Sequence, residues 1–358
     1  MSTHFLTSPM RDLLPSARPA LVLAPMQDVT DLPFMRVLAR RGAPDWFVTE
    51  YFRVHPHSGL NAYILRSISE NETGRPVFAQ MIGKEIPDLV RTARELAAYP
   101  VAGIDLNLGC PAPVVCRKDA GGGLLRDPVK VDAILGALRD AIPGRFTVKT
   151  RLGYHSPDEF PKLLEIFRKH AIDGLTIHGR TVEDRYATPV KPDSVKLAVE
   201  TMPCPVIANG NVVDAETALA YHRQTGAAGL MVGRGAIRNP WIFDGIVAAF
   251  LGMKPPEPTR RNLLDYILEL SEELAREHPD YNPLLHIQRM KKTLIYICEG
   301  IDPNFEREIR RMKTPAEFEN LCGEHLDTPE ALKPLPPGDS RIFCGFSELL
   351  NEPEKSRM

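Results

Sequence analysis

The sequence predicts an α/β chain in which a (β/α)₈ barrel is followed by a small C-terminal helical domain. Short apolar runs alternate with longer amphipathic stretches between about residue 20 and residue 250 of the 358-residue chain. Three prolines in four positions then interrupt this pattern, and apolar residues at helical spacing follow. A barrel of this kind takes about 250 residues, so the first part of the chain has the required length.

Eight of the apolar runs are expected to be the barrel strands. Each is a brief Val-, Ile- or Leu-rich segment without strict polar alternation, as is typical of parallel strands that are buried on both faces. An open, doubly wound sheet is the alternative, because it is built from the same strand and helix units. The runs are Leu21 to Ala24, Trp46 to Thr49, Val77 to Gln80, Gly103 to Asn107, Thr147 to Thr150, Gly174 to His178, Val206 to Asn209 and Gly229 to Val232.

The chain is therefore expected to consist of five segments. Residues 1–19 form an N-terminal segment, 20–253 the barrel, 254–259 a proline-rich linker, 260–332 the helical domain and 333–358 an extended tail. Prolines in the linker forbid a continuing helix. The helices of the second domain are indicated by Arg260 to Glu277, by Leu284 to Cys298, and by the capping box Thr314-Pro315-Ala316-Glu317.

Composition and charge limit the function classes. Apolar residues make up 43% of the chain and charged residues 25%, which excludes a disordered chain or a disulfide scaffold. A formal net charge of −2 by itself argues against a protein that coats nucleic acid. The six cysteines show neither zinc spacing nor a paired pattern, so we expect no metal, no disulfide framework and a reducing cytoplasm. No run has the length or apolarity of a signal peptide or a membrane span.

Polar residues follow almost every predicted strand. The C-terminal ends of the strands meet at one mouth of a barrel, where catalytic residues gather, so we expect a functional site there. Loops after the seventh and eighth strands commonly bind phosphate through glycines and backbone N–H groups. The strand-end residues are Pro25, Met26, Glu50, Gln80, Asn107, Cys110, Lys149, Arg151, His178, Arg180, Asn209, Gly210, Asn211, Gly233 and Arg234.

Six of these strand ends form a series with a defined order and spacing. They are Ala24-Pro25-Met26-Gln27-Asp28-Val29-Thr30-Asp31, Asp105-Leu106-Asn107-Leu108-Gly109-Cys110-Pro111, Val148-Lys149-Thr150-Arg151-Leu152-Gly153, Ile177-His178-Gly179-Arg180-Thr181, Ile207-Ala208-Asn209-Gly210-Asn211 and Val232-Gly233-Arg234-Gly235-Ala236. The series resembles the motifs of the tRNA-dihydrouridine synthases across the whole barrel and, more weakly, into the helical domain. Thr49 to Val54 and Gly121 to Gly123 resemble the bacterial C-type branch of that family.

The resemblance implies an FMN-dependent enzyme that uses NADPH to reduce the C5–C6 double bond of a uridine in tRNA. Hydride from reduced FMN is expected to add at C6, and a positioned acid must then protonate C5. Cys110 matches the catalytic loop and is the expected acid, because a cysteine thiol is mostly protonated near neutral pH and still acidic enough to deliver its proton. Asn107 matches a residue that hydrogen-bonds the uracil edge; alternatively, it holds the loop backbone.

Most other strand-end residues are assigned to FMN by the same resemblance. Lys149 points inward and could stabilise an anionic reduced flavin. Arg234 could form a pair of hydrogen bonds with phosphate oxygens. Position 211 departs from the acidic residue frequent there, although backbone N–H groups do much of the phosphate binding. The FMN set is Ala24, Pro25, Met26, Gln80, Lys149, His178, Asn209, Gly210, Asn211, Gly233 and Arg234.

A uridine in folded RNA is stacked, so the enzyme has to move the base into the barrel mouth. We expect the helical domain to hold the tRNA, with its Glu-rich first helix facing away from the RNA. A solvated face of mixed charge is the alternative. Arg151 could equally pair with a barrel carboxylate. The expected RNA contacts are Arg289, Lys291 and Lys292 on one helix, and Arg151, Arg180, Arg185 and Lys191 at the mouth.

Two other functions remain open at this stage. One is a flavin barrel that acts on a small pyrimidine, as in dihydroorotate dehydrogenases, and the helical domain argues against it because a small substrate gives that domain no task. The other is a tRNA-binding or tRNA-folding protein with a structural flavin, and the free thiol and Lys149 argue against that. We expect a monomer. Neither the modified uridine nor an NADPH site follows from the sequence, which has no Gly-x-Gly-x-x-Gly motif after a strand.

Overall fold

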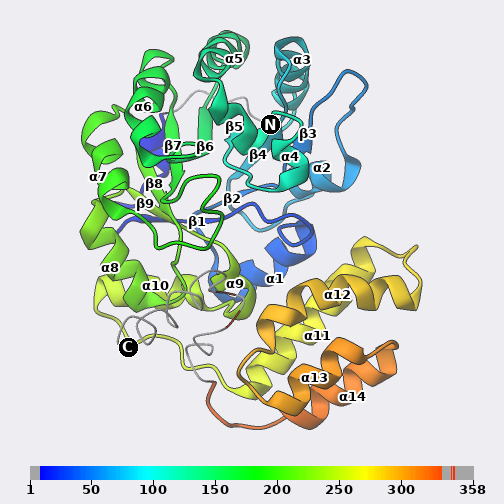
Figure 1. The fold of residues 1–358 in the computed structure, drawn as a ribbon. Coiled ribbons are helices and arrows are strands. Elements are labelled where there is room, and N and C mark those ends of the chain that lie inside the picture. Colours follow the sequence, from blue (N-terminus) through cyan, green and yellow to red (C-terminus); the bar gives the residue numbers. More distant parts are fainter. Residues whose placement is uncertain (1–8, 333–339, 341, 343–358) are drawn as a thin grey trace, which may run out of the picture.

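The barrel is closed in the computed structural model, which describes residues 9–332, 340 and 342 (Figure 1). The rest of the predicted tail, 333–358, and residues 1–8 of the predicted N-terminal segment lie outside the described residues. β1 (Ala20–Leu23) pairs with β2 (Trp46–Val48) on one side and with β9 (Gly229–Val232) on the other. β2 also pairs with β4 (Val77–Ile82), and this pairing closes the ring.

All strand pairings in the ring are parallel, in the order β2-β1-β9-β8-β7-β6-β5-β4. The closed ring confirms the predicted (β/α)₈ barrel, and each of its eight strands overlaps one of the eight predicted runs. An open sheet is thereby excluded. A further short strand, β3 (Phe52–Arg53), was not expected and pairs with the end of β4. The remaining strands are β5 (Gly103–Leu108), β6 (Phe146–Arg151), β7 (Gly174–His178) and β8 (Val206–Asn209).

Successive side chains of a strand point to opposite faces, and in β1 both faces are apolar. Leu21 and Leu23 of β1 belong to the core beneath the helices, whereas Ala20 and Val22 belong to a smaller core inside the barrel. Met10, from the 3₁₀ helix η2 (Met10–Leu13), packs into that inner core. Apolar side chains therefore fill one end of the barrel, and the polar residues at the C-terminal ends of the strands lie at the other end.

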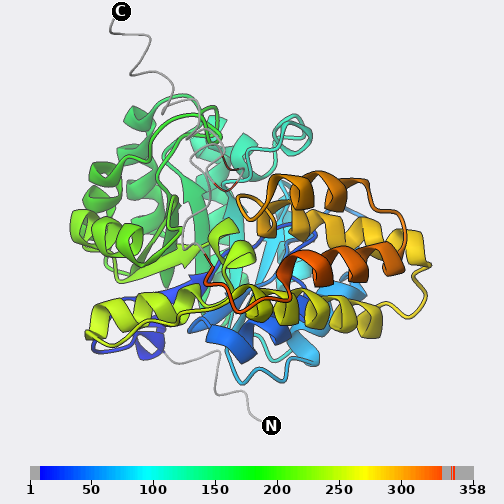
Figure 2. The same ribbon diagram turned by 90° about the horizontal axis from the view of Figure 1, so that it is seen from below.

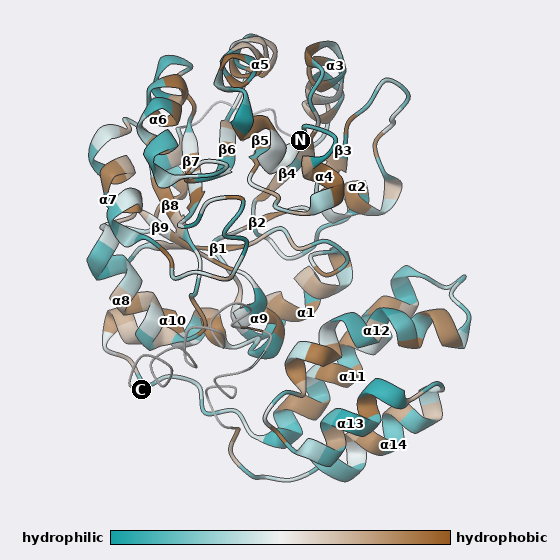
Figure 3. Ribbon diagram, in the orientation of Figure 1, coloured by the Kyte–Doolittle hydropathy of each residue, from teal (hydrophilic) through white to brown (hydrophobic). Residues whose placement is uncertain are grey.

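The helices around the barrel turn apolar faces toward the strands and hydrophilic faces outward (Figure 3). Their ends carry the expected local signals: α8 starts at a capping box of Asp214 and Thr217 and stops at Gly226, which has φ +65°. The helices are α1 (Leu32–Gly42), α2 (Ala62–Ser69), α3 (Ile86–Leu96), α4 (Pro113–Cys116), α5 (Pro128–Ala141), α6 (Phe160–Lys169), α7 (Pro192–Thr201), α8 (Ala215–Thr225), α9 (Arg234–Arg238) and α10 (Ile242–Leu251), with η3 (Gly121–Arg126) and η4 (Pro157–Glu159) between them.

Within residues 254–332, four further helices follow the barrel: α11 (Arg260–Glu277), α12 (Pro283–Ile297), α13 (Pro303–Arg311) and α14 (Pro315–Leu326). α11 has the predicted bounds, and the predicted capping box is present at the start of α14. α13 was not expected, although its Asp302 cap, Pro303 and buried Phe305 are helix signals in the sequence. The predicted linker 254–259 lies between α10 and α11.

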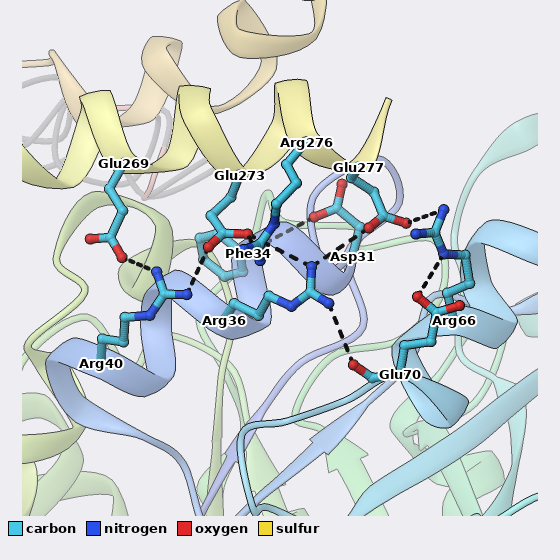
Figure 4. A network of polar contacts seen from close by, with 10 residues as sticks. All are labelled: Asp31, Phe34, Arg36, Arg40, Arg66, Glu70, Glu269, Glu273, Arg276 and Glu277. Atoms are coloured by element: carbon cyan, nitrogen blue, oxygen red, sulfur yellow. Dashed lines mark hydrogen bonds and ion pairs between the residues drawn. The ribbon is translucent and has the colours of Figure 1, made fainter. Parts of the chain in front are cut away.

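Carboxylates on one face of α11 hold the helical domain against the barrel (Figure 4). Arg40 Nη2 of α1 lies 2.7 Å from Glu273 Oε1, and Arg66 Nη1 of α2 lies 3.1 Å from Glu277 Oε1. Glu269 also pairs with Arg40. These three glutamates are thus committed to the contact between the two parts of the chain, and the expectation that the Glu-rich helix faces away from RNA stays a prediction. Among the described residues, no helix is long and apolar enough to cross a membrane.

Candidate active site

A cavity of about 690 Å³ opens at the C-terminal ends of the barrel strands. Its volume falls in the range of small-molecule and cofactor sites, about 300–1,000 Å³. Loops that follow β1, β5, β7, β8 and β9, together with side chains of β6, form its wall. The predicted site residues that line it are Ala24, Pro25, Met26, Asn107, Cys110, Lys149, Arg151, His178, Asn209, Gly210, Asn211, Gly233 and Arg234.

The Cys110 loop is held from below by the side chain of Asn107. Its Oδ1 accepts hydrogen bonds from the backbone N–H groups of Gly109 (3.1 Å) and Cys110 (3.0 Å), and its Nδ2 donates to Gln80 Oε1 (2.8 Å). Asn107 therefore holds the loop backbone, the second of its two predicted roles. Contact with a uracil ring stays a prediction. Because the loop lies at the cavity wall, these bonds present the Cys110 side chain at the wall.

Gln80 lies beneath the cavity rather than on its wall. The residue is fully buried, its Nε2 donates to Asp105 Oδ2 (2.7 Å), and its Oε1 is taken by Asn107. Thr147 Oγ1 donates to the other oxygen of Asp105 (2.7 Å). The amide oxygen of Gln80 thus orients Asn107 and its nitrogen holds Asp105, and a contact between Gln80 and FMN stays a prediction.

Two ionisable groups, the buried Asp105 and the half-buried Lys149, lie on the neighbouring strands β5 and β6. Burial raises the pKa of Asp105 to about 6, opposed by hydrogen bonds from Thr147 and Gln80. Burial also lowers the pKa of Lys149 to about 8, and the Arg151 charge lowers it further while Asp105 raises it. Lys149 Nζ donates to Asn209 Oδ1 at 3.2 Å. At pH 7 the ammonium is therefore mostly charged and faces the cavity between β6 and β8.

Arg151 ties the Cys110 loop to the loop after β7. It is 2% exposed, and its guanidinium donates to the backbone carbonyls of Gly109 (3.0 Å), Thr181 (2.8 Å) and Arg185 (2.7 Å). The predicted RNA contact is therefore revised to a positioning role, and the alternative of a carboxylate partner is replaced by these three carbonyls. The charge still lines the cavity and adds to its positive potential.

We expect Arg151→Lys to destabilise the protein. A lysine cannot reach three carbonyls in fixed directions, so buried acceptors are left without donors, which costs about 1–3 kcal/mol of unfolding free energy. Denaturant titration measures this change, and hydrogen exchange at Gly109 and Cys110 should become faster. Arg168→Lys, at an exposed position of α6, is the matched control and should change the unfolding free energy by less than about 0.5 kcal/mol. Equal stability of the two variants would contradict the positioning role.

The turns after β8 and β9 form the predicted phosphate end of the cavity. Gly210 has φ +122° and Asn211 has φ +58°, a left-handed conformation that asparagine tolerates. Asn211 Oδ1 accepts a hydrogen bond from Arg180 Nη2 at 3.1 Å. Arg180 is only 1% exposed, so its predicted RNA contact is also revised. Its buried guanidinium fixes the turn by donating to Asn211 and to the Thr188 carbonyl.

His178 lines the cavity and has one buried ring nitrogen without a partner among the described residues. Burial, followed by the charges of Arg151 and Lys149, lowers the pKa of His178 well below its ordinary value, so the imidazole is neutral. Its Nδ1 is buried and has no hydrogen-bond partner among the described residues. A buried nitrogen without a partner costs free energy, and a ligand in the cavity could supply the missing bond.

Tyr186 is a cavity residue that the sequence interpretation missed. Its ring lies 4.5 Å from the guanidinium carbon of Arg234 and 5.4 Å from that of Arg151, and it meets the His178 ring edge-on at 6.0 Å. Tyr186 follows Arg185 directly in the loop after β7, and this position could have indicated a cavity residue. From the sequence, only the cations of that loop were considered. Gln27, Tyr51 and Arg53 line the cavity too and were likewise missed.

The three predicted RNA cations of α12 do not form one patch. Arg289 Nη2 lies 2.7 Å from Asp31 Oδ2, and Lys292 Nζ lies 2.6 Å from Asp28 Oδ2, so both face the loop after β1. Lys291 Nζ instead donates to the Arg310 carbonyl at 3.0 Å. Residues three apart share a helix face whereas adjacent ones do not, which explains the division. At the mouth, Arg185 is exposed and lines the cavity, whereas Lys191 pairs with Asp184 at 2.9 Å.

Among the described residues, no group of three or more His, Cys, Asp or Glu side chains is placed to hold a metal ion. Cys110 is a free thiol, as are the other four cysteines that the structure describes. Cys116 Sγ lies 3.4 Å from the Cys110 carbonyl oxygen and so contacts the backbone of the loop.

Comparison with known proteins decides the family. The family model described as "Dihydrouridine synthase (Dus)" matches residues 22–330, which is most of the barrel and helical domain. The chain belongs to the dihydrouridine synthase family. As a member of this family it is an enzyme, an oxidoreductase.

Relatives of similar length support the dihydrouridine synthase assignment. A probable tRNA-dihydrouridine synthase 2 from Bacillus subtilis is 33% identical over 75% of this chain and 83% of its own length. The tRNA-dihydrouridine synthase B of Xanthomonas axonopodis is 31% identical over 87% and 94%. A probable tRNA-dihydrouridine synthase of Staphylococcus aureus is 33% identical over 86% and 93%. None of these three is C-type by name, so the C-type branch stays a prediction.

Among solved structures, the old yellow enzyme from Trypanosoma cruzi has a TM-score of 0.50. It is 12% identical in sequence and is matched over 77% of this chain and 98% of its own. This likeness is one of fold, and it agrees with the closed barrel.

Proposed function

We propose that this protein reduces the C5–C6 double bond of a uridine in tRNA, with FMN as its cofactor and NADPH as its reductant. The observation that carries the proposal is the placement of Cys110: a free thiol, on a loop held by Asn107 and Arg151, at the wall of a cavity lined with cations. Membership of the dihydrouridine synthase family and the names of its relatives support the same reaction.

The cavity suits FMN on three observations. Positive charge from Lys149 and Arg234 lies along its wall, which favours an anionic ligand. The unpaired Nδ1 of His178 calls for a polar partner. Gly233 lines the cavity, and a Cβ there would lie 3.7 Å from Ala24 Cβ and 3.8 Å from Met26 Sδ, so a side chain would extend along a wall that a ligand needs. Asn209, Gly210, Asn211, Gly233 and Arg234 would hold the phosphate, and Ala24, Pro25, Met26, Lys149 and His178 the ring.

Bound and reduced FMN would supply the hydride for C6 of the uracil. The protein supplies the remaining parts. Cys110 donates a proton to C5, and Asn107 and Arg151 keep the thiol in place while it does so. Lys149 offers a mostly protonated ammonium near neutral pH, which would stabilise negative charge on the reduced ring.

An assay with purified protein tests the proposal. The protein is incubated with FMN, NADPH and unmodified tRNA, and dihydrouridine is measured by mass spectrometry and mapped along the RNA. We expect dihydrouridine at a defined position, because a flipped base has to be presented in one geometry. Reduction of free uracil or orotate but not of tRNA would favour the small-pyrimidine alternative. Binding of tRNA without reduction would favour a binding or folding protein.

α13 carries the cations best placed for RNA in the helical domain. Arg307, Arg310 and Arg311 are exposed there, as is Lys313 just after the helix, and α13 lies on the same side of the molecule as α4 and the Cys110 loop (Figure 2). Sequence reasoning missed these cations because it missed the helix. They complement the α12 cations, of which Arg289 and Lys292 are paired with barrel carboxylates.

Reversing two of these charges tests the α13 surface. We expect Arg307→Glu with Arg311→Glu to weaken tRNA binding about tenfold and to lower the salt slope of log Kd by about 1 for each phosphate that is no longer neutralised. The rate at saturating tRNA should be unchanged, because neither residue lines the reaction cavity. Lys162→Glu with Arg168→Glu on α6, away from the helical domain, is the control (Figure 1). An equal drop in affinity in both double variants would contradict a specific role for α13.

A further inference from the structure

A second cavity, of about 590 Å³, lies between the barrel and the helical domain. Gln27, Tyr51 and Arg53 line both this cavity and the reaction cavity, so the two adjoin. We propose that the second cavity binds another unstacked base of the RNA, next in the strand to the uridine that enters the reaction cavity. This inference rests on the proposed function, because it assumes an RNA substrate.

Aromatic rings from both parts of the chain line the second cavity. Tyr63 of α2 lies 4.7 Å from the His278 ring, centroid to centroid, and His278 stacks on Tyr281 at 4.2 Å with an interplanar angle of 7°. Tyr63 is 48% exposed, which leaves ring surface for a ligand. Aromatic rings of this kind are the usual platforms for unstacked bases, because every base has a flat π-face.

A buried nitrogen in this stack indicates a polar ligand. His278 Nδ1 is buried and has no hydrogen-bond partner among the described residues. Burial lowers the pKa of His278, so its ring is neutral near pH 7 and one of its two nitrogens can accept a hydrogen bond. The edge of a base carries both N–H donors and ring acceptors, so it can supply the missing partner whichever nitrogen bears the proton.

Charge in the second cavity selects a base rather than a phosphate. Asp31, Glu50 and Glu277 line it together with Arg53 and Arg289, and the Arg289 guanidinium is already shared between Asp28 (3.1 Å) and Asp31 (2.7 Å). Burial raises the pKa of Glu50 to about 7, so near neutral pH its carboxyl group is partly protonated and can donate as well as accept a hydrogen bond. Carboxylates repel phosphate groups and accept hydrogen bonds from amino groups. The cavity therefore suits a base with an exocyclic amino group, and it does not suit the phosphate-rich NADPH.

The residues that separate the two cavities are held by a hydrogen bond and a cation–π contact. Gln27 Nε2 donates to Glu50 Oε2 at 2.7 Å, and Glu50 is buried. Arg53 lies over the Tyr51 ring, with its guanidinium carbon 5.9 Å from the ring centroid. Two neighbouring bases held on either side of a fixed wall would be splayed apart. Such splaying would help to keep the uridine out of the stack and would make the neighbour part of the recognition.

The test combines altered tRNA with altered protein. Once the reduced uridine is mapped, tRNAs are made with an abasic nucleotide immediately 5′ or 3′ of it. For one of the two, we expect kcat/KM of the native protein to fall about 5- to 150-fold, the range of base–aromatic stacking. In Tyr63→Ala with Tyr281→Ala, kcat/KM on intact tRNA should fall by a similar factor, and the abasic nucleotide should cause no further decrease. Tyr99→Ala, at the end of α3, is the control and should respond as the native protein does.

A binding measurement keeps the inference testable without turnover. 2-Aminopurine, an amino-bearing fluorescent base, replaces the neighbour, and we expect its fluorescence to be quenched on binding to the native protein but not to the double variant. Thermal unfolding checks that the variants are folded. Native protein that reduces intact tRNA yet is indifferent to both abasic nucleotides would overturn the inference and leave the proposed function standing. Absence of dihydrouridine on intact tRNA would overturn the proposed function, and unquenched 2-aminopurine would still count separately against the second cavity.

Discussion

Cys110→Ala is expected to lower the rate of dihydrouridine formation by about 10²- to 10⁴-fold, the usual contribution of a positioned acid. The backbone of the loop should remain in place, because Asn107 and Arg151 bind the backbone of Gly109 and Cys110 rather than the thiol. Tight tRNA binding and normal reduction of bound FMN by NADPH should therefore survive. Single-turnover kinetics with pre-reduced enzyme and tRNA would measure the chemical step alone.

Cys204→Ala is the matched control for this experiment. Its thiol is outside the reaction cavity, and burial raises the pKa of Cys204 to about 12, so it is a poor proton donor. We expect its replacement to leave the single-turnover rate within about twofold of the native value. A Cys110→Ala variant that forms dihydrouridine at the native rate would remove Cys110 from the proposed reaction and would leave the cation-lined cavity without an assigned acid.

Lys149→Gln is expected to have the second large effect, a decrease of about 10²- to 10³-fold in the rate at which FMN in the protein is reduced. Lys149 of β6 is half-buried at the cavity wall and donates to Asn209 of β8, so its charge is poorly screened and would act strongly on a ring in the cavity. Glutamine keeps most of the length and a hydrogen-bond donor for Asn209 but removes the charge. Stopped-flow absorbance during reduction by NADPH would measure the rate, and FMN fluorescence would measure retained binding.

The pH dependence gives a separate check on Lys149. Its pKa of about 8 lies below the ordinary lysine value, so the ammonium is present below pH 8 and is lost as the pH rises through 8. We therefore expect FMN reduction in the native protein to fall on the alkaline side with a midpoint near pH 8. Lys149→Arg stays protonated and should not show this fall. An alkaline limb that is the same in both proteins would assign the titration to another group.

The strands and most helices could be predicted from the sequence because their signals are local. Short runs such as Leu21 to Ala24 are apolar on both faces, which is typical of a buried parallel strand. A capping box marks where α11 begins, and a capping box with a first-turn proline marks where α14 begins. α13 was not predicted because it has only nine residues, most of them charged. Phe305 and Ile309 are its two buried apolar residues, too few for a clear helical pattern.

Spatial contacts between distant residues decided the roles within the site. Gln80 and Arg180 stand at strand ends like true cavity residues, yet their partners Asp105 and Asn211 draw them into the interior. Nothing in the local sequence distinguishes them from Lys149, which faces the cavity. The sequence also could not show that Arg289 and Lys292 of α12 are paired, because their partners Asp31 and Asp28 are more than 250 positions earlier in the chain.

By itself the sequence determined the barrel, the bounds of α11 and the strand-end motifs that carry the thiol and the phosphate loops, since hydrophobic period and turn chemistry are properties of neighbouring residues. Only the tertiary structure decided which polar strand ends face the cavity, that the acidic face of α11 joins the two parts of the chain, and that a second cavity opens beside the first. Those features depend on which side chains from distant segments meet, and the free energy of a buried polar group depends on the partner that it finds there.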